Sequence, residues 1–513
     1  MPYNNLIYGA IILFLANLIS RILGFIYQYL IMHYIGSEAY GLFHMVFPVY
    51  MTALVFTTAG IPLAISKMVS EKVAAGHYGD AQKTFRLALL TLFFSGLFVS
   101  LFLFFNATWI VDLFFADKRV LIVFRICIPA IFVVALASAF RGYFQGLQNM
   151  IPSAISQISE QVFRVSVGFT LSLKMLAYGI DWAAAGLAAG MLGGEIIGFL
   201  IILWQYLAGK NKRNIRIKNS QQSTRTILRG LFTLSLPVTG SRLMSSGLSA
   251  LEAIIIPKQL QVAGFSARAA TSLFGQLSGT AMTLLTFPSV FTFALSTSLV
   301  PAISEAIGRR DYKLAQSRCS DAIRYTILLG LPCVIALYFY SEPLTLIFNS
   351  KEVANVLKIL AFGGLFTYLQ QTTTGILQGL GKTYLPLLHS TISASFRLPL
   401  LFYLTGLPQW GLLGSSCTYV LGYFCMALLN LRAIKRNIGM TFNYQTFLLQ
   451  PFSAGFGMLV VLKAGTFYVT ITPLSALALT AAGFIVYLFI LTLNGGITSK
   501  DLKKVPLLKR LYS

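Results

Sequence analysis

Four arginines lie in apolar stretches that are long enough to cross a lipid bilayer: Arg21, Arg164, Arg242 and Arg397. A guanidinium keeps its proton at every accessible pH, so each stretch must hold a positive charge in or near a membrane core. Such charges are costly in lipid and usually face a watery cavity, an acidic partner or a polar ligand. Because a guanidinium also pairs with phosphate oxygens through two parallel hydrogen bonds, the four arginines predict either an anion-binding site or internal ion pairs.

Arg21 and Arg242 have similar local sequences. Each follows a serine and stands 12 residues after a glycine, Gly9 and Gly230 respectively. We predict that the two guanidinium groups bind an anionic ligand in a central cavity. The alternative is an interhelical ion pair, in which Glu252 is the candidate partner of Arg242.

Arg164 and Arg397 lie deep in two later stretches. Glu160 precedes Arg164 by four residues, a spacing that favours a local ion pair on a helix, so a structural role competes with substrate binding. Arg397 has no such acid and is followed by Pro399. For Arg397 a role in the cavity and a role in contacts between the two halves of the chain remain equally open.

Several other charged residues are candidates for coupling or gating. Glu252, Glu195 and Glu160 lie in apolar stretches, where a carboxylate either carries a coupling proton or serves as an ion-pair partner. Lys67 and Glu305 occupy related helix ends near the predicted cytoplasmic surface. They could form a cytoplasmic gate, but side chains that extend from the membrane into water explain them equally well.

The composition predicts an all-α polytopic membrane protein. Of the 513 residues, 56% are apolar and only 11% are charged, whereas soluble globular chains carry about 25% charged residues. Apolar segments of about 20 residues, long enough to span a bilayer, recur from end to end. We predict about 14 transmembrane helices, at residues 6–34, 42–66, 87–111, 120–140, 154–173, 183–208, 231–257, 273–303, 325–347, 355–380, 384–405, 411–431, 446–466 and 473–494.

Neither cofactor nor metal chemistry is predicted, and we expect the protein not to be an enzyme. The five cysteines show no CxxC spacing and the four histidines show no ligand spacing. The chain also lacks a recognisable arrangement of nucleophile, base and acid, and a phosphate-binding loop.

The distribution of basic residues predicts how the chain crosses the membrane. With the N-terminus in the cytoplasm, 26 of the 39 lysines and arginines fall in inward loops and the C-terminal tail, and nine fall outside. The rule that positive loops stay inside therefore places both termini of a cell-membrane protein in the cytoplasm. The net charge of +24 then suits anionic membrane lipids and not nucleic acid.

Motifs recur in the same order in the two halves of the chain. GxxQGL begins at Gly142 and again at Gly375, and Phe163-Arg164 matches Phe396-Arg397, both with an offset of 233. An even number of spans in each repeat predicts two lobes of the same orientation with a central site between them. The predicted parts are an N-terminal lobe (1–208), a basic cytoplasmic linker (209–230), a C-terminal lobe (231–436), and two appended helices with a basic cytoplasmic tail (437–513).

These motifs resemble the multidrug/oligosaccharidyl-lipid/polysaccharide exporter superfamily. Residues 20–25 (SRILGF) are similar to the first helix of the lipid II flippase family, whereas residues 60–67 (GIPLAISK) and 140–152 (FRGYFQGLQNMIP) are closer to the stage V sporulation protein B family. The resemblance covers essentially the whole chain. It implies two six-helix lobes, two extra helices, and alternating access that moves an anionic lipid-linked sugar across the cytoplasmic membrane.

The resemblance also implies a role for Arg21, which matches the cavity arginine in the first helix of the flippases. The next family arginine and its acidic neighbour fall at Tyr27 and Gln28, and the arginine of the second helix has no match around Tyr50. The chain therefore keeps only part of that cationic set.

Taken together, these residues predict a flippase for undecaprenyl-pyrophosphate-linked cell-wall precursors, acting as a monomer in peptidoglycan or spore cortex synthesis. Its partners would be the lipid-linked precursor, anionic lipids and cell-wall synthesis proteins. One alternative is an exporter of another polysaccharide-linked lipid or of a drug. A different class of alternative is a membrane scaffold that recruits cortex-synthesis proteins without transport.

Overall fold

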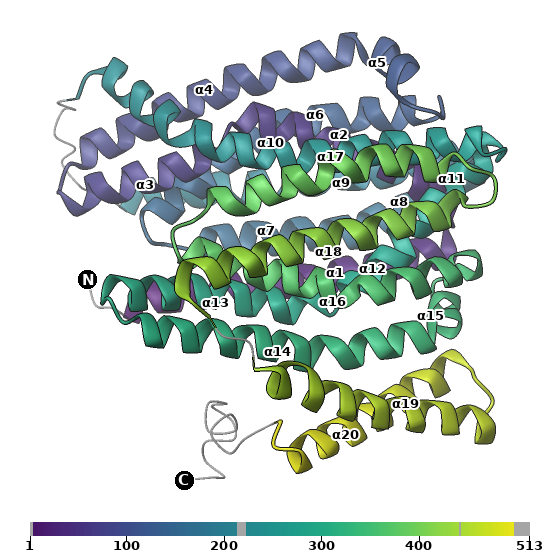
Figure 1. The fold of residues 1–513 in the computed structure, drawn as a ribbon. Helices are drawn as coiled ribbons and strands as arrows, with labels where there is room; N and C mark the ends of the chain where they lie inside the picture. The colour runs from purple at the N-terminus through teal and green to yellow at the C-terminus, as the bar shows by residue number, and fades with distance from the viewer. Residues whose placement is uncertain (1–3, 213–221, 441–442, 497–513) are drawn as a thin grey trace. The chain divides into compact units, whose positions relative to one another are not determined.

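The computed structural model describes residues 4–212, 222–440 and 443–496, and every regular element in these ranges is a helix (Figure 1). Eleven helical segments of the described chain are long and apolar enough to cross a membrane. The predicted all-α polytopic fold is therefore confirmed, while the number fourteen stays a prediction. The three predicted spans outside this count, 154–173, 231–257 and 384–405, do form helices. They are richer in polar residues, and they are the segments that carry Arg164, Arg242 and Arg397.

The chain packs into two compact units that divide after Gly275. The first unit contains both long and short helices, and Gly36, Gly60 and Gly76 stand at three of the turns between them. Its elements are α1 (Asn4–Tyr34), α2 (Ser37–Thr58), α3 (Ile61–Ala74), α4 (Tyr78–Phe105), α5 (Ala107–Phe114), α6 (Val120–Gly146), α7 (Ile151–Phe163), a π-helical turn (Arg164–Gly168), α8 (Phe169–Met175), α9 (Ile180–Lys212), α10 (Thr224–Val262) and α11 (Ala267–Gln276).

The second unit continues from the end of α11 through another π-helical turn. Its elements are that turn (Leu277–Ala281), α12 (Met282–Thr286), α13 (Ser289–Gly308), α14 (Tyr312–Phe339), α15 (Ser341–Ile347), α16 (Ala354–Gly379), α17 (Tyr384–Thr405), α18 (Gly411–Ile438), α19 (Gln450–Tyr468) and α20 (Pro473–Leu493). Helix α16 packs against α13, α14 and α18, so it forms the centre of this unit.

The compact units divide at a different point from the lobes that the repeat predicts. Helices α10 and α11, which the repeat assigns to the second lobe, belong to the first unit because α10 packs against α2 and α3. The hydroxyl oxygens of Ser37 and Ser272 also lie 2.8 Å apart, which joins the start of α2 to α11. The lobe boundaries at 208 and 231 stay a prediction, and much of the linker and all of the C-terminal tail beyond residue 496 lie outside the described residues.

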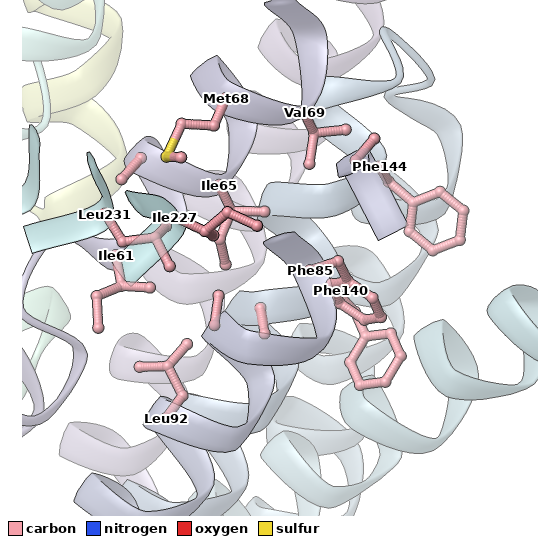
Figure 2. Packing of buried hydrophobic residues seen from close by; sticks show 14 of the residues in the cluster. Ile61, Ile65, Met68, Val69, Phe85, Leu92, Phe140, Phe144, Ile227 and Leu231 are labelled. Carbon is pink, nitrogen blue, oxygen red and sulfur yellow. The ribbon is translucent and has the colours of Figure 1, made fainter. Parts of the chain in front are cut away.

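An apolar cluster joins the start of α10 to α3, α4 and α6. Ile227 and Leu231 of α10 are fully or almost fully buried beside Ile61, Ile65 and Met68 of α3 (Figure 2). Each buried aliphatic side chain contributes about 1.5–3 kcal/mol relative to its exposed state in water. Between lipid-solvated helices, this packing acts instead through van der Waals contact. The cluster therefore explains why α10 is part of the first unit.

Glycines at related positions bring helices together in both halves of the chain. A Cβ on Gly142 would lie 2.6 Å from the backbone oxygen of Pro62, and a Cβ on Gly375 would lie 2.9 Å from the backbone oxygen of Ser296. Gly186 meets the backbone of Ser172 in the same way. Because Gly142 and Gly375 are the glycines of the repeated GxxQGL motif, their equivalent contacts support the internal repeat at the level of helix packing.

Candidate functional site

Arg164 lies in an ion cluster inside the first unit. It begins the π-helical turn after α7, and its Nη2 atom is 3.0 Å from Oε1 of Glu160 and 2.9 Å from Oε1 of Glu195. The contact with Glu160 is the local pair that the four-residue spacing predicts. The contact with Glu195 comes from α9 and depends on tertiary packing. Such π-helical turns often occur at functional sites because they redirect a side chain.

Close packing of α9 against α7 and α8 brings Glu195 to Arg164. A Cβ on Gly190 would lie 2.2 Å from the Cα of Gly168, and one on Gly194 would lie 2.9 Å from the backbone oxygen of Glu160. Real Cβ atoms do not approach so closely, so only glycine allows this backbone contact. These glycines therefore permit the close packing of α9 against α7 and α8.

A second arginine completes the cluster. Arg141 donates from Nη2 to Oε2 of Glu160 over 2.9 Å. Arg141 lies directly after the predicted span 120–140, but α6 continues to Gly146 and holds Arg141 within its last turns. The two guanidinium groups and the carboxylates of Glu160 and Glu195 balance in charge, which lowers the free energy of burying them.

Several polar atoms near this cluster have no hydrogen-bond partner among the described residues. They include the Nε atoms of Arg141 and Arg164 and the hydroxyl groups of Tyr27 and Tyr50. Both tyrosines are buried and lie close enough to Arg164 to interact with it electrostatically. The flippase resemblance leads one to look for further arginines at Tyr27 and around Tyr50. In this chain the neutral hydroxyl groups of two tyrosines lie there instead, beside an ion cluster whose charges balance.

Arg21 and Arg242 have a different setting from Arg164. Both are exposed residues within helices, Arg21 in α1 and Arg242 in α10. Among the described residues no ion pair is found for Arg242. Glu252 is half-buried ten residues further along α10, about 15 Å away along the helix axis, which is beyond the reach of a pair within one helix.

Arg397 stands at the position of the second repeat that corresponds to Arg164. Its guanidinium carbon lies 5.4 Å from the ring centre of Tyr419, within the range of a cation–π contact. Gly422 of α18 packs against the Arg397 side chain, as Gly194 packs against Arg164. The same helix crossing therefore holds both arginines, with carboxylates in the first unit and an aromatic ring in the second.

The two residues of the predicted cytoplasmic gate make ion pairs close to them in sequence. Nζ of Lys67 is 3.9 Å from Oε1 of Glu71, and Oε1 of Glu305 is 2.7 Å from Nη2 of Arg309. These side chains are well exposed, and exposed pairs contribute only about 0–1 kcal/mol. A gate formed by Lys67 and Glu305 stays a prediction.

A polar cluster around Arg119 was not predicted from the sequence. Arg119, just before α6, lies 2.7 Å from a carboxylate oxygen of Asp117, 2.7 Å from one of Glu38 and 3.4 Å from one of Asp181. Asp117 is buried and also accepts a hydrogen bond from Thr271 in α11. In sequence, Arg119 is only one of nine outward basic residues, because its partners Glu38 and Asp181 lie in segments that are distant along the chain.

The surroundings of Asp117 stabilise its charged form. Burial alone would raise the pKa of the Asp117 carboxyl, but hydrogen bonds from Arg119 and Thr271 outweigh this effect and hold the pKa below its ordinary value. The hydrogen bond to Asp117 in turn raises the pKa of Arg119. The cluster is thus ionised at neutral pH and ties α2, α6, α9 and α11 together.

The fold and these charged helices define a class of protein. Many membrane-length helices that carry charged side chains in their interior are typical of membrane transport proteins. A family model described as "Polysaccharide biosynthesis protein" matches residues 6–307, and a second model, MatE, matches residues 276–403. The chain belongs to the polysaccharide biosynthesis protein family, within the multidrug/oligosaccharidyl-lipid/polysaccharide exporter superfamily of transporters.

Individual relatives agree with this assignment. The chain is 32% identical to stage V sporulation protein B of Bacillus subtilis (strain 168) over 527 residues, covering 100% of this chain and 99% of that protein. It is 26% identical to the lipid II flippase MurJ of the same organism over 490 residues, covering 89% and 88%. The solved structure of lipid II flippase MurJ in an inward closed conformation has the same fold, with a TM-score of 0.71 at 19% identity over 93% of this chain and 98% of that chain.

Proposed function

We propose that this protein is a flippase that moves an undecaprenyl-pyrophosphate-linked sugar precursor across the cytoplasmic membrane. Its family and the names of its relatives, stage V sporulation protein B and lipid II flippase MurJ, support a lipid-linked cell-wall precursor as the substrate class. Cell-wall or spore cortex synthesis is the corresponding setting. Transport proceeds by exposing a cationic binding region alternately to the two sides while the isoprenoid tail stays in lipid.

The proposal rests on where the arginines lie and on what they contact. Arg141 and Arg164 are already compensated by Glu160 and Glu195, so they hold the first unit together. Arg21 and Arg242 are exposed within membrane helices. Placing a charge there costs free energy, and binding of an anionic ligand offsets this cost. We assign Arg21 and Arg242 to pyrophosphate binding and Arg397 to a further contact with the head group.

Reconstitution tests the proposal directly. Purified protein in liposomes should flip lipid II, and Arg21→Ala and Arg242→Ala should each lower the rate about 10- to 100-fold, since a hydrogen bond to a charged group contributes about 1.5–3 kcal/mol. Arg268→Ala is the matched control, because Arg268 is an exposed arginine at the other end of the same unit, in α11. Full activity of both cavity variants would overturn the assignment.

Substrate preference distinguishes the first alternative. Lipid II and a teichoic or capsular precursor, supplied in separate liposomes at equal density, should be flipped at different rates. Preference for the second class would make the protein an exporter of another polysaccharide-linked lipid. Discrimination requires different contacts in the two conformations, because equal affinity for both shifts no population.

Complementation distinguishes the scaffold alternative. In a strain lacking the gene, Arg21→Ala with Arg242→Ala should fail to restore function, whereas a chain truncated after residue 496 should restore it. The reverse result would favour a scaffold that recruits partners through its tail.

A further inference from the structure

A buried histidine lies within a neutral polar network in the second unit. His389, in α17, is 7% exposed, and its Nδ1 atom is 2.7 Å from Oδ1 of Asn430 in α18. The Nδ2 atom of Asn430 donates to Oγ1 of Thr373 in α16 over 3.1 Å and to Oγ1 of Thr374 over 3.3 Å. Asn430 and Thr373 are completely buried. The network therefore joins α16, α17 and α18 inside the unit.

The hydrogen bonds of Thr373 determine the state of the imidazole. The single hydroxyl proton of Thr373 is donated to backbone oxygens of its own helix, those of Leu369 at 2.7 Å and Gln370 at 3.1 Å. The Thr373 oxygen can therefore only accept from Asn430, which directs the amide NH2 of Asn430 towards Thr373 and its Oδ1 towards His389. Because Oδ1 is an acceptor, Nδ1 of His389 carries the proton. The lone pair of Nε2 is then the remaining proton-accepting position of the ring.

The charges around His389 differ from those at the equivalent place in the first repeat. With the offset of 233, His389, Thr374 and Ser393 correspond to Ser156, Arg141 and Glu160. In the first unit Arg141 contacts both Ser156 and Glu160, so that network is charged and compensated. In the second unit the hydrogen-bond partner of His389, Asn430, is uncharged. A proton on His389 therefore adds a charge that its network does not neutralise.

The titratable or charged groups nearest to this network in sequence come from all three packed helices. On α18 the nearest in sequence to Asn430 are Arg432, which is exposed, and Cys425. On α16 the nearest is Tyr368, whose hydroxyl donates to the backbone oxygen of Leu285. On α17 itself, Tyr384 is exposed and Arg397 follows His389 by two helical turns.

We propose that His389 is a proton-binding site of the transporter, taking up a proton at Nε2 and releasing it during the transport cycle. The protonated ring places an uncompensated charge among α16, α17 and α18, which favours any arrangement of these helices that admits water. An imidazole is suited to this task because it can bind and release a proton at its second nitrogen while the first nitrogen keeps its hydrogen bond. The inference rests on the proposed transport function and names a coupling or regulatory ion for it.

Nitrogen NMR tests the site without a transport assay. The chain has only four histidines, so 15N-histidine spectra of the purified full-length protein are simple, and the signal lost in His389→Asn identifies His389. We expect the Nδ1–H tautomer at high pH and a second proton, on Nε2, at lower pH. An Nε2–H tautomer, or a ring that stays neutral at every pH at which the protein remains folded, would refute the proposal.

Transport in liposomes of defined internal and external pH gives the second readout. A single proton makes the wild-type rate change by at most about tenfold per pH unit. His389→Asn keeps an amide N–H donor for Asn430 but cannot take up a proton, so its rate should be independent of pH. His77→Asn, at an exposed histidine between α3 and α4, is the control and should keep the wild-type profile.

The two readouts separate this inference from the proposed function. A His389→Asn protein with the wild-type pH profile would overturn the role of His389 while leaving the flippase proposal intact. A wild-type protein that flips none of the lipids tested would overturn the proposed function, and the NMR titration would still decide whether His389 binds a proton.

Discussion

At the residue scale, Arg164 and Arg397 differ in the side chains that they contact. Arg164 shares Glu160 with Arg141 and has Glu195 to itself, so all four charges balance within the first unit. Arg397 has the equivalent position in the repeat but lies over the ring of Tyr419. The arginine is repeated in the two halves, whereas the contacts described for it are carboxylates in the first unit and an aromatic ring in the second.

Removing one charge of the compensated cluster should destabilise the protein more than removing a balanced pair. Glu195→Gln leaves two arginines with a single carboxylate, and breaking a buried pair in this way costs about 3–5 kcal/mol. The double variant Arg164→Gln with Glu195→Gln leaves the balanced pair of Arg141 and Glu160. We expect the thermal unfolding midpoint in detergent to fall for each single variant and to recover in part in the double variant. Additive losses would contradict the charge-balance argument.

The outward cluster should make stability depend on pH through Asp117. Its pKa is lowered in the folded protein, so it stabilises the fold above the ordinary carboxyl pKa, and this contribution is lost as the pH falls through the lowered value. Arg119→Met removes the main hydrogen-bond donor and leaves Asp117 buried. The midpoint of acid unfolding, followed by circular dichroism, should then rise by at least about one pH unit.

The neighbouring Lys118 is the control for this measurement. Its Nζ is 3.0 Å from a carboxylate oxygen of Asp112, and both side chains are more than half exposed. Exposed pairs contribute little, so Lys118→Met should leave the acid midpoint nearly unchanged. Equal shifts in the two variants would mean that net charge, and not the buried cluster, sets the pH dependence.

At the scale of elements, α9 approaches α7 and α8 through glycines, and this contact brings Glu195 to Arg164. A Cβ on Gly190 would lie 2.2 Å from the Cα of Gly168, so a side chain at Gly190 must push the helices apart. Helices in lipid associate through close van der Waals contact of this kind. The ion cluster is thus a consequence of helix packing as much as of charge.

Gly190→Ala should destabilise the first unit by about 1–3 kcal/mol or more, the usual range for overpacking. Gly209 lies in the same helix with no atom within 4 Å of an added Cβ. Gly209→Ala should therefore be neutral or stabilise the helix by about 0.5–1 kcal/mol. Thermal unfolding of both variants in detergent checks the pair, and a neutral Gly190→Ala would show that the close approach is not required.

At the scale of the whole molecule, the basic residues predict that both termini lie in the cytoplasm. Cysteines introduced in a cysteine-free background at His77 and at Lys118 report on this orientation, since both residues are exposed at turns at opposite ends of α4 and its neighbours. We expect a membrane-impermeant thiol reagent to label the Lys118 position in intact cells and the His77 position only after permeabilisation. The opposite pattern would invert the topology.

Much of the fold follows from local features of the chain. Long apolar runs predict membrane helices because an unpaired backbone is too costly in lipid, and the paired Glu160 and Arg164 follow from helical spacing alone. Three helices with Arg164, Arg242 and Arg397 are harder to recognise by hydropathy, since polar residues interrupt their apolar runs. The predicted spans 154–173, 231–257 and 384–405 nevertheless include them, because their apolar runs are still about 20 residues long.

The sequence by itself determined that this is a helical membrane protein, which residues carry charge into its helices, and which family motifs it holds, because these depend on composition and on short spacings. Only the tertiary structure decided which groups each charged side chain contacts. Glu195, Arg141, the partners of Arg119 and the network of His389 all come together across helices that are distant in sequence. Helix packing, governed here by glycine contacts and buried polar groups, decides those distances, and no local pattern encodes them.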